Sequence, residues 1–538
     1  MIIVEVRDPQ YKEKPKCYVP ELCNLLGIND EDTKNFKFMK QIIEKTRLSP
    51  DQKIEQIEKC IDLFTDMTEI KSIHNDKKGE NLNTIYGDEN NTSKRKTEYY
   101  GIKISKLKKP IKPYYIQEPT FNNGRNKTLS IKDINDVIPV ARENISTDDW
   151  ICLYTIQAEK ISFDLLKGLL KCCRGYNIKF KNDDSNWIPM KSNNVNDWIN
   201  KVENELNYRK NCKFVMFLIN NKTDKLYAPL KKHSLSTCGY VSQVIKYESI
   251  MRIMKKRGLD SYFSKILLQI NNKLGGFNYF LNIPNFINDR KIMLIGVDSS
   301  HTWGSKSAKF NNKKTGVAMI ATKDKNFSKF YSNEEIIKYD KHYCSSTRRA
   351  ISAFIEQAVK RYKKENGENP KNIIIYRQGI AHNQIKKIDL EVRDIESICK
   401  ELDIKYYYVL VNTRGNIKFF EKNTSGSKYE KGKYKNPEGG LIILNQITNI
   451  KRFEFYIQPQ KVNIGSATPT YFNVAYGNMD CPPLLIQLTY WTTFIYPNWQ
   501  NAVRVPHVIK LAEKLANMIA KFTHSKLNEN LFDTQSFL

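Results

Sequence analysis

The chain has 538 residues, which is enough to bury at least two hydrophobic cores. It carries 87 lysines and arginines against 58 aspartates and glutamates, and this surplus of 29 positive charges favours a polyanionic partner such as single-stranded nucleic acid. No apolar segment approaches the roughly 20 residues of a membrane span, and the 11 cysteines form no Cys-x-x-Cys pair, which argues against a disulfide framework and a structural zinc site. We therefore expect a soluble intracellular protein, although abundant Lys and Asn would also fit a lysine-rich proteome in which basicity carries little meaning.

The N-terminal part predicts small elements separated by polar segments. Residues 1–65 predict a short strand and then helices, with one helix over 18–28 and another after Pro50. Residues 71–97 are charged and rich in Asn, Lys and Gly, so we expect a mobile insertion there. Residues 98–145 predict short strands and turns around prolines, as in a linker.

Two α/β units follow. The first begins at Trp150 with a strand over 150–156, and the second begins at Lys291 with a continuous apolar run that suits a central strand. An acid, Asp298, ends that run. An acid at the end of the first strand, together with the order of the strands given below, suggests a ribonuclease H-like layer. The first unit continues with a helix over 161–173, a strand over 212–219 and a helix over 262–276. The second continues with strands over 317–322, 373–379 and 406–411 and helices over 348–362, 389–402 and 508–522.

Five segments of the second unit resemble consecutive blocks of the Argonaute family, Piwi clade, in the family's order and at compatible spacings. The first resembles the first catalytic strand of the family, and the second resembles a segment that usually reads YRDG. A chance match of all five is negligible, whereas one alone would be weak. The segments are IGVDSSH (295–301), IIIYRQGIAHNQ (373–384), GSATPTYFNVAY (465–476), QLTYWTTFIYPNW (487–499) and VRVPHVIKLAEKLA (503–516).

The resemblance implies an α/β fold made of a Rossmann-like MID domain and a ribonuclease H-like PIWI domain. It assigns 1–20 to the remnant of a PAZ end, 21–149 to the second linker, 150–285 to MID and 286–538 to PIWI. The segment that starts at Cys17 resembles the exit of PAZ. By resemblance, the chain therefore lacks the N domain, the first linker and most of PAZ.

The resemblance also implies a site for the 5′ phosphate of a guide RNA. A phosphate needs several donors that converge on one point, and Tyr227, Lys231, Gln243 and Lys273 match the family's positions in order. In the family the ring stacks on the first base, while the lysines and the amide bind the phosphate. The four-residue spacing from Tyr227 to Lys231 suits one helical face. The alternative is that these are ordinary solvated side chains.

Two further expectations concern this pocket. Argonautes end on a hydrophobic pair whose carboxylate points toward the phosphate, so the resemblance implies that Phe537 and Leu538 close the fold there. It also implies Mg²⁺ at the guide phosphate as the one ion to consider. No cofactor is expected for catalysis.

The nuclease positions are incomplete. Cutting RNA by the ribonuclease H route needs about two divalent ions held by several carboxylates. By resemblance, Asp298 keeps the first carboxylate and Glu513 takes the final position, but Gln378 replaces the second Asp. The inserted Glu of the family should fall near Ser346, yet residues 343–349 contain no acid. We therefore expect no active catalytic residue and no metal in the nuclease site.

Two other interpretations stay open. His301 and His382 could replace the missing ligands, which would give an active metal-dependent RNA endonuclease with a rearranged site. Alternatively, the protein could be a scaffold whose RNA pocket is vestigial. Glu334 and Glu335 lie too far upstream of the expected position to supply the inserted Glu by a simple shift.

The leading hypothesis is a small-RNA-binding Piwi protein without slicer activity. Arg377, Arg414 and Lys418 are expected to contact the RNA backbone, which would make affinity salt-dependent without specifying sequence. Base pairing with the guide would select a complementary target RNA. A protein that cannot cut would act in RNA silencing or processing by recruiting or stabilising partners such as a nuclease or a processing factor. We expect no membrane partner, and a location in the cytoplasm, the nucleus or both.

Overall fold

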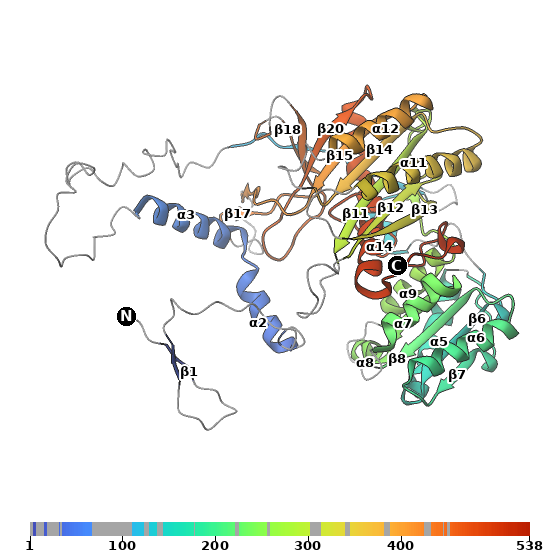
Figure 1. Cartoon of the computed structure of the whole chain (residues 1–538). Coiled ribbons are helices and arrows are strands. Elements are labelled where there is room, and N and C mark those ends of the chain that lie inside the picture. The colour runs from blue at the N-terminus through green and yellow to red at the C-terminus, as the bar shows by residue number, and fades with distance from the viewer. Residues whose placement is uncertain are drawn as a thin grey trace, which may run out of the picture. The chain divides into compact units, whose positions relative to one another are not determined.

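The structure is a computed structural model and divides into two compact units (Figure 1). The first unit comprises Met1–Lys108, Phe420–Asn436 and Val462–Ala467, and the second comprises the rest of the chain. None of the helices in the described part is long and apolar enough to cross a membrane. The structure describes residues 4–6, 16–18, 32, 35–66, 110–122, 128–136, 144–176, 178–220, 225–254, 259–301, 314–338, 345–380, 388–423, 432–444, 446–448 and 452–538.

The first unit holds small elements. Its predicted strand and its helix after Pro50 are confirmed, whereas the predicted helix over 18–28 and the predicted insertion over 71–97 lie outside the described residues. Asp51 in the first turn of α3 accepts hydrogen bonds from the backbone N–H groups of Lys433 and Tyr434. The elements are β1 (Val4–Val6), β2 (Lys16–Tyr18), α2 (Phe36–Thr46), α3 (Pro50–Asp66), β16 (Glu421–Lys422) and β17 (Tyr434–Lys435).

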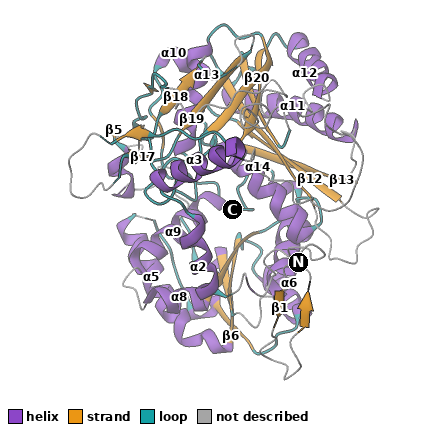
Figure 2. Cartoon of the chain, turned by 90° about the vertical axis from the view of Figure 1, so that its left-hand side faces the viewer, coloured by secondary structure: helices purple, strands orange, loops and turns teal. Residues whose placement is uncertain are grey.

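The second unit contains a four-stranded parallel sheet in the order β7-β6-β8-β9. Every residue of β6 and β8 is buried, because apolar runs of this kind suit a parallel sheet with helices on both faces. Helices α5, α8 and α9 pack together on one face (Figure 2), and α6 and α7 cover the other. The bounds are β6 (Trp150–Thr155), α5 (Glu159–Gly175), β7 (Trp187–Met190), α6 (Val195–Tyr208), β8 (Phe214–Ile219), α7 (Tyr227–Lys232), β9 (Val241–Lys246), α8 (Tyr247–Met254) and α9 (Leu259–Lys273).

A mixed nine-stranded sheet forms the other half of the second unit, in the order β13-β12-β11-β14-β15-β20-β19-β18-β3. Strand β11 is antiparallel to β12 and parallel to β14, and the strands predicted over 317–322, 373–379 and 406–411 are confirmed as β12, β14 and β15. The short strands expected between residues 98 and 145 are also present. The bounds are β3 (Tyr114–Tyr115), β4 (Phe121–Asn122), β5 (Thr128–Leu129), β10 (Phe280–Leu281), β11 (Ile292–His301), β12 (Lys314–Thr322), β13 (Phe330–Lys338), β14 (Asn372–Gln378), β15 (Lys405–Asn412), β18 (Leu441–Leu444), β19 (Phe453–Gln458) and β20 (Thr470–Gly477).

Helices cover both faces of the nine-stranded sheet. α11 and α12 pack on one face around Phe354 and Ile395, and α14 packs on the other against β11 and β12. Gly296 of β11 permits this close approach, because a Cβ there would lie 2.4 Å from the backbone carbonyl of Val508. The bounds are α10 (Asn285–Asn288), α11 (Ser345–Asn366), α12 (Asp389–Glu401), α13 (Pro482–Trp491) and α14 (His507–Met518).

The last residues of the chain connect the two sheets. After α14 the chain continues into the π-helix η12 (Ile519–Thr523), and the backbone N–H of Asn528 then donates to the Leu235 carbonyl at 2.7 Å. The Phe532 carbonyl accepts from the backbone N–H of Ser332 in β13. The C-terminal segment is thus hydrogen-bonded to both halves of the second unit.

Candidate functional site: two buried charged clusters

Two lysines meet around one backbone carbonyl. Lys231 lies at the end of α7 and Lys273 at the end of α9, while Ser242 and Gln243 are neighbours in β9. The Lys273 ammonium donates to the Ser242 carbonyl at 2.9 Å and to Gln243 Oε1 at 2.7 Å. The Lys231 ammonium donates to the same carbonyl at 3.2 Å and to Ser242 Oγ at 3.1 Å. We call these four residues the two-lysine site.

Both ammonium groups of the two-lysine site are removed from water. Lys231 is 2% exposed and Lys273 is 1% exposed, so they are not ordinary solvated side chains. Burial lowers the pKa of Lys231 to about 8, and burial lowers the pKa of Lys273 further, with smaller contributions from Lys231 and Lys514. No carboxylate in the described part of the chain forms an ion pair with either lysine. Because uncompensated buried charge is costly, this arrangement favours a bound anion.

Tyr227 and the two C-terminal residues pack in or against the same hydrophobic cluster. Tyr227 begins α7, as the four-residue spacing predicted, and its ring meets that of Phe522 edge-on at 5.1 Å. Phe537 and Leu538 are buried in the main core, and the Leu538 N–H donates to the Gln535 carbonyl. The predicted direction of the terminal carboxylate stays a prediction.

A larger cavity adjoins the two-lysine site at Gln243. It has a volume of about 540 Å³ and lies between β9, α9 and the loop 497–501. Lys246 and Lys265 contribute positive charge to its wall, and the Lys265 ammonium lies 5.9 Å from the centre of the Trp499 ring. Cations combined with an exposed aromatic ring are typical of surfaces that bind single-stranded nucleic acid.

The acidic position lies on the nine-stranded sheet. Val297 of β11 pairs with Arg377 of β14. The next residue on each strand, Asp298 and Gln378, therefore lie side by side on neighbouring parallel strands. Burial raises the pKa of Asp298 to about 6; the Ser299 N–H, Arg377 and Lys510 act in the opposite direction, and Glu513 adds to the rise. The carboxylates of Asp298 and Glu513 are therefore close enough to interact.

A lysine lies close to both acids. The Lys510 ammonium lies 2.8 Å from Glu513 Oε2 on α14, and it also lowers the pKa of Asp298. We call Asp298, Gln378, Lys510 and Glu513 the acid site. Its cation comes from the protein itself, which reduces the need for an external ion.

The residues considered as substitute ligands lie elsewhere or outside the described part. His301 Nδ1 is 2.9 Å from Thr315 Oγ1, and burial lowers the pKa of His301. His382 is not among the described residues. Ser346 in the first turn of α11 is exposed, and Glu334 accepts a hydrogen bond from the backbone of Leu527. Among the described residues, no cluster of three metal-ligating groups includes Asp298.

Comparison with known proteins identifies the family. The Piwi domain model matches residues 214–524, which is more than half of the chain. The chain belongs to the Piwi clade of the Argonaute family. It is 28% identical to Protein argonaute-3 of Drosophila melanogaster over 532 residues, covering 97% of this chain and 55% of that protein. It is 26% identical to Piwi-like protein 1 of Danio rerio, covering 97% of this chain and 56% of that protein. The chain thus spans about half the length of these relatives.

Solved structures confirm the fold. The crystal structure of Drosophila Piwi superposes with a TM-score of 0.75 at 21% identity, covering 97% of this chain and 65% of that one. Clostridium butyricum Argonaute, solved with a guide DNA and a target DNA, superposes with a TM-score of 0.69 at 18% identity, covering 99% of this chain and 66% of that one. The predicted combination of MID and PIWI folds is confirmed, and the assignment of the parallel sheet to MID and of the nine-stranded sheet to PIWI stays a prediction.

The three basic residues expected on the RNA path differ in their surroundings. Arg414 is exposed, and Lys418 donates to Thr468 Oγ1. Arg377, in contrast, is 2% exposed and its Nε lies 3.6 Å from Glu391 Oε1. The contact of Arg377 with the RNA backbone stays a prediction, and its burial leaves little of the side chain accessible to RNA.

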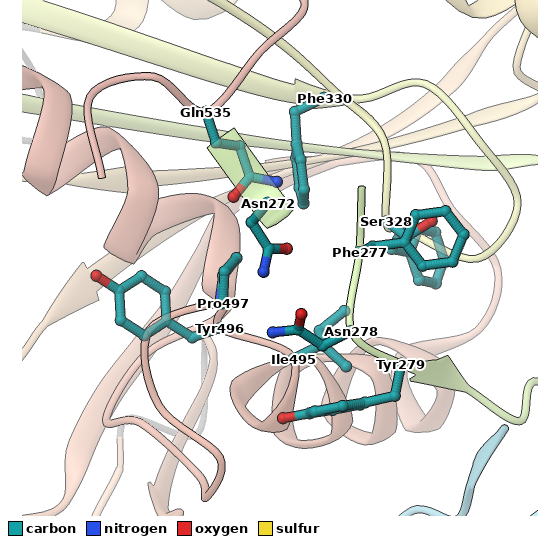
Figure 3. A pocket seen from close by; sticks show the side chains of 11 residues that line it. Asn272, Phe277, Asn278, Tyr279, Ser328, Phe330, Ile495, Tyr496, Pro497 and Gln535 are labelled. Atoms are coloured by element: carbon teal, nitrogen blue, oxygen red, sulfur yellow. The ribbon is translucent and has the colours of Figure 1, made fainter. Parts of the chain in front are cut away.

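Sequence reasoning missed Lys514, which lies close enough to Lys273 to lower its pKa. It also missed a small polar cavity of about 20 Å³, which has room for about one water molecule. Figure 3 shows the amides of Asn272 and Asn278 from the MID side and Gln535 from the C-terminal segment converging there. Helical spacing from Glu513 could have placed Lys514 on α14, but only the fold brings α14 to the end of α9.

Proposed function

We propose that this Piwi protein holds a small guide RNA by its 5′ phosphate and does not cut the RNA that pairs with the guide. The observation that carries the proposal is the burial of Lys231 and Lys273 without a described acid in ion-pair contact. A phosphate would supply the missing negative charge and accept charge-assisted hydrogen bonds from both ammonium groups. Gln243, bonded to Lys273, would orient the same group.

The surroundings support a nucleic acid rather than a free anion. The cavity of about 540 Å³ beside Gln243 offers lysines and Trp499 for the nucleotides that follow the phosphate. Tyr227 begins the helix that carries Lys231, so its ring could stack on the first base. Kluyveromyces polysporus Argonaute, which was solved with a guide RNA, shares this fold with a TM-score of 0.65 at 16% identity, covering 79% of this chain and 53% of that one.

A Mg²⁺ ion at that phosphate fits the residues poorly. Mg²⁺ prefers several oxygen ligands in octahedral geometry. Gln243 Oε1 already accepts from Lys273, and no described carboxylate forms an ion pair at the two-lysine site. We therefore assign the compensation of the phosphate charge to the two lysines, without Mg²⁺.

The absence of cutting is proposed from the acid site. Gln378 stands beside Asp298 where active relatives would need a second carboxylate, and Lys510 supplies a competing cation. Target choice would then come from base pairing, and silencing or processing would depend on partner proteins inside the cell.

The test compares two RNAs of one sequence, with a 5′ phosphate or a 5′ hydroxyl, binding to the full chain. Two charge-assisted hydrogen bonds are worth roughly 3 kcal/mol or more, so the phosphorylated RNA should bind at least about 100-fold more tightly. Equal affinities would overturn the phosphate site. Sequencing of RNA that co-purifies with the protein then separates a guide holder from a scaffold.

A cleavage assay tests the proposal that the protein does not cut the paired RNA. A fully complementary target RNA is incubated with the guide-loaded protein in Mg²⁺ or Mn²⁺, and no product is expected. Cleavage that disappears in the Asp298→Ala variant would favour the metal-dependent endonuclease instead.

A further inference from the structure

A second group of charged and polar side chains lies in the MID half, apart from the two-lysine site. Glu203 comes from α6, and His233 and Cys238 are the first and last residues of the π-helix η8 (His233–Cys238). His233 Nε2 is 3.0 Å from Glu203 Oε1 and 3.2 Å from Cys238 Sγ. The carboxylate oxygen, the imidazole nitrogen and the sulfur all lie within 4.8 Å of one another.

Hydrogen bonds from the His233 ring cannot satisfy Glu203 and Cys238 at the same time. His233 Nδ1 is 3.1 Å from the Tyr240 hydroxyl, so one ring nitrogen is already used. A neutral imidazole has one donor nitrogen and one acceptor nitrogen. If Nδ1 donates to Tyr240, Nε2 presents a lone pair toward the carboxylate of Glu203. If Nε2 donates instead, it can serve Glu203 or Cys238 well but not both.

A cation at the centre would satisfy all three atoms together. We propose that Glu203, His233 and Cys238 bind a zinc-class divalent ion, with water in the fourth coordination position. Zinc ligands lie about 2.0–2.3 Å from the metal, so neighbouring ligand atoms in a tetrahedral site are roughly 3.3–3.8 Å apart. Small rotations of the exposed Glu203 and Cys238 side chains are enough to reach that spacing from the present one.

The donor set selects the class of ion. Thiolate and imidazole ligands favour zinc and neighbouring transition metals over Mg²⁺ or Ca²⁺, which take oxygen ligands. The Tyr240 hydroxyl on Nδ1 fixes the ring orientation and leaves Nε2 free to coordinate, as supporting groups do around metal-bound histidines. His233 is 5% exposed, while Glu203 and Cys238 are exposed, so an ion can enter from solvent.

The position of the site gives the ion a structural consequence. An ion held by His233 and Cys238 would tie both ends of η8 to α6. Within η8, Ser234 Oγ donates to the Lys231 carbonyl and contacts Ser242 Oγ at 2.9 Å. The ion would therefore stiffen the helix that supports the two-lysine site. The lack of a Cys-x-x-Cys pair argued against a structural zinc site, but it does not bear on this one. Its ligands Glu203 and His233 are 30 positions apart, so no short motif marks them in the sequence.

The test uses Co²⁺ as a spectroscopic probe on the metal-free full chain, without RNA. We expect one Co²⁺ per chain, with a thiolate-to-cobalt charge-transfer absorption that Zn²⁺ abolishes by displacement. Cys238→Ser should remove the charge-transfer absorption, and Glu203→Gln should weaken Co²⁺ binding at least tenfold. Both side chains are exposed, so both variants are expected to fold, which circular dichroism checks.

The matched control is Cys60→Ser, which removes another exposed cysteine from α3. This variant should keep the full cobalt spectrum and stoichiometry. A wild-type protein without the charge-transfer absorption, or an absorption that persists in Cys238→Ser, would overturn the proposed site. The readout involves no RNA, so either result is independent of guide binding.

Discussion

The two charged clusters of this molecule have opposite charges and different kinds of compensation. The two-lysine site places two ammonium groups around the Ser242 carbonyl and pairs neither with a described acid. The acid site places Asp298 near Glu513, and the protein supplies Lys510 within 2.8 Å of Glu513. The first cluster is incomplete until an anion binds. The second is partly compensated from within, because Lys510 sets one positive charge against the two acids.

The two sites also differ in how the free-energy cost of burying their charges is relieved. In the two-lysine site, burial disfavours the charged form of the lysines, so the free protein bears a penalty that ligand binding relieves. In the acid site, burial disfavours the charged form of Asp298, and Lys510 relieves part of that penalty in every state of the protein. Four predictions follow from this difference in compensation, taken from the largest expected effect to the smallest.

The largest effect is expected from removing both buried charges with Lys231→Met and Lys273→Met together. Affinity for 5′-phosphorylated RNA should fall at least about 100-fold, because two charge-assisted contacts are lost. The ligand-free protein should become more stable, since methionine fills a buried position without a desolvated charge. Filter binding and thermal unfolding measure the two changes.

The control for that variant is Lys232→Met, an exposed neighbour on the same helix. It should change affinity by less than about threefold, as expected for a solvated surface charge. A double variant that still prefers the 5′ phosphate as strongly as the wild type would show that the buried lysines do not form the phosphate site.

The second prediction concerns the acid site. Gln378→Asp combined with Lys510→Met adds a carboxylate beside Asp298 and removes the internal cation. Because the acids would then lack a counter-charge, Mn²⁺ affinity should rise by about 30-fold, or roughly 2 kcal/mol. Titration of Mn²⁺ followed by electron paramagnetic resonance measures it. The same pair of changes in an Asp298→Asn background should show no gain, and a gain there would place the ion elsewhere.

The third prediction is a pH dependence of RNA binding. The phosphate binds the protonated lysine, whose pKa in the free protein is lowered to about 8 for Lys231, so binding takes up a proton above that pH. Affinity for 5′-phosphorylated RNA should therefore fall as the pH rises, and Lys231 contributes up to about tenfold per pH unit from pH 8 upward. Burial also lowers the pKa of Lys273, so its loss of a proton adds to the fall. RNA with a 5′ hydroxyl should show a much smaller slope. Equal slopes for the two RNAs would contradict the assignment of the proton to the phosphate site.

Particular residues show what the sequence could predict. Strands β6, β8 and β11 were predictable because a buried parallel strand is a continuous apolar run, and α5, α9 and α11 because their apolar residues recur at helical spacing. Strand β7 and helix α6 were not predicted. Trp187–Met190 is a short strand with mixed burial, and most of α6 is polar with Trp198 and Val202 as its fully buried residues.

The candidate sites were only partly predictable for a related reason. The match of four residues to the family's phosphate-binding positions predicted that Lys231, Gln243 and Lys273 share one site, and the fold does bring them together. It could not show that both lysines are buried or that they lack an acid, because burial depends on the packing of α7, β9 and α9. Lys510 lies within the helix predicted over 508–522, but its closeness to Asp298 depends on the packing of α14 against β11, which the sequence does not show.

The smallest effect is expected from Asp298→Asn. Burial raises the pKa of Asp298 to about 6, so the buried carboxylate lowers stability progressively as the pH rises from about 4 to about 6, and by a constant amount above that. The neutral amide removes this penalty but needs hydrogen-bond partners of its own, which leaves a net gain of about 1 kcal/mol at pH 7. Below about pH 3 Asp298 is neutral in the folded and in the unfolded chain, so the gain disappears and the hydrogen-bond cost of the amide leaves Asp298→Asn the less stable protein. Urea unfolding at pH 7 and at about pH 3 measures the difference. A loss of stability at pH 7 would contradict this prediction. It would mean that Lys510 and Arg377 compensate the Asp298 charge more favourably than the raised pKa of Asp298 implies.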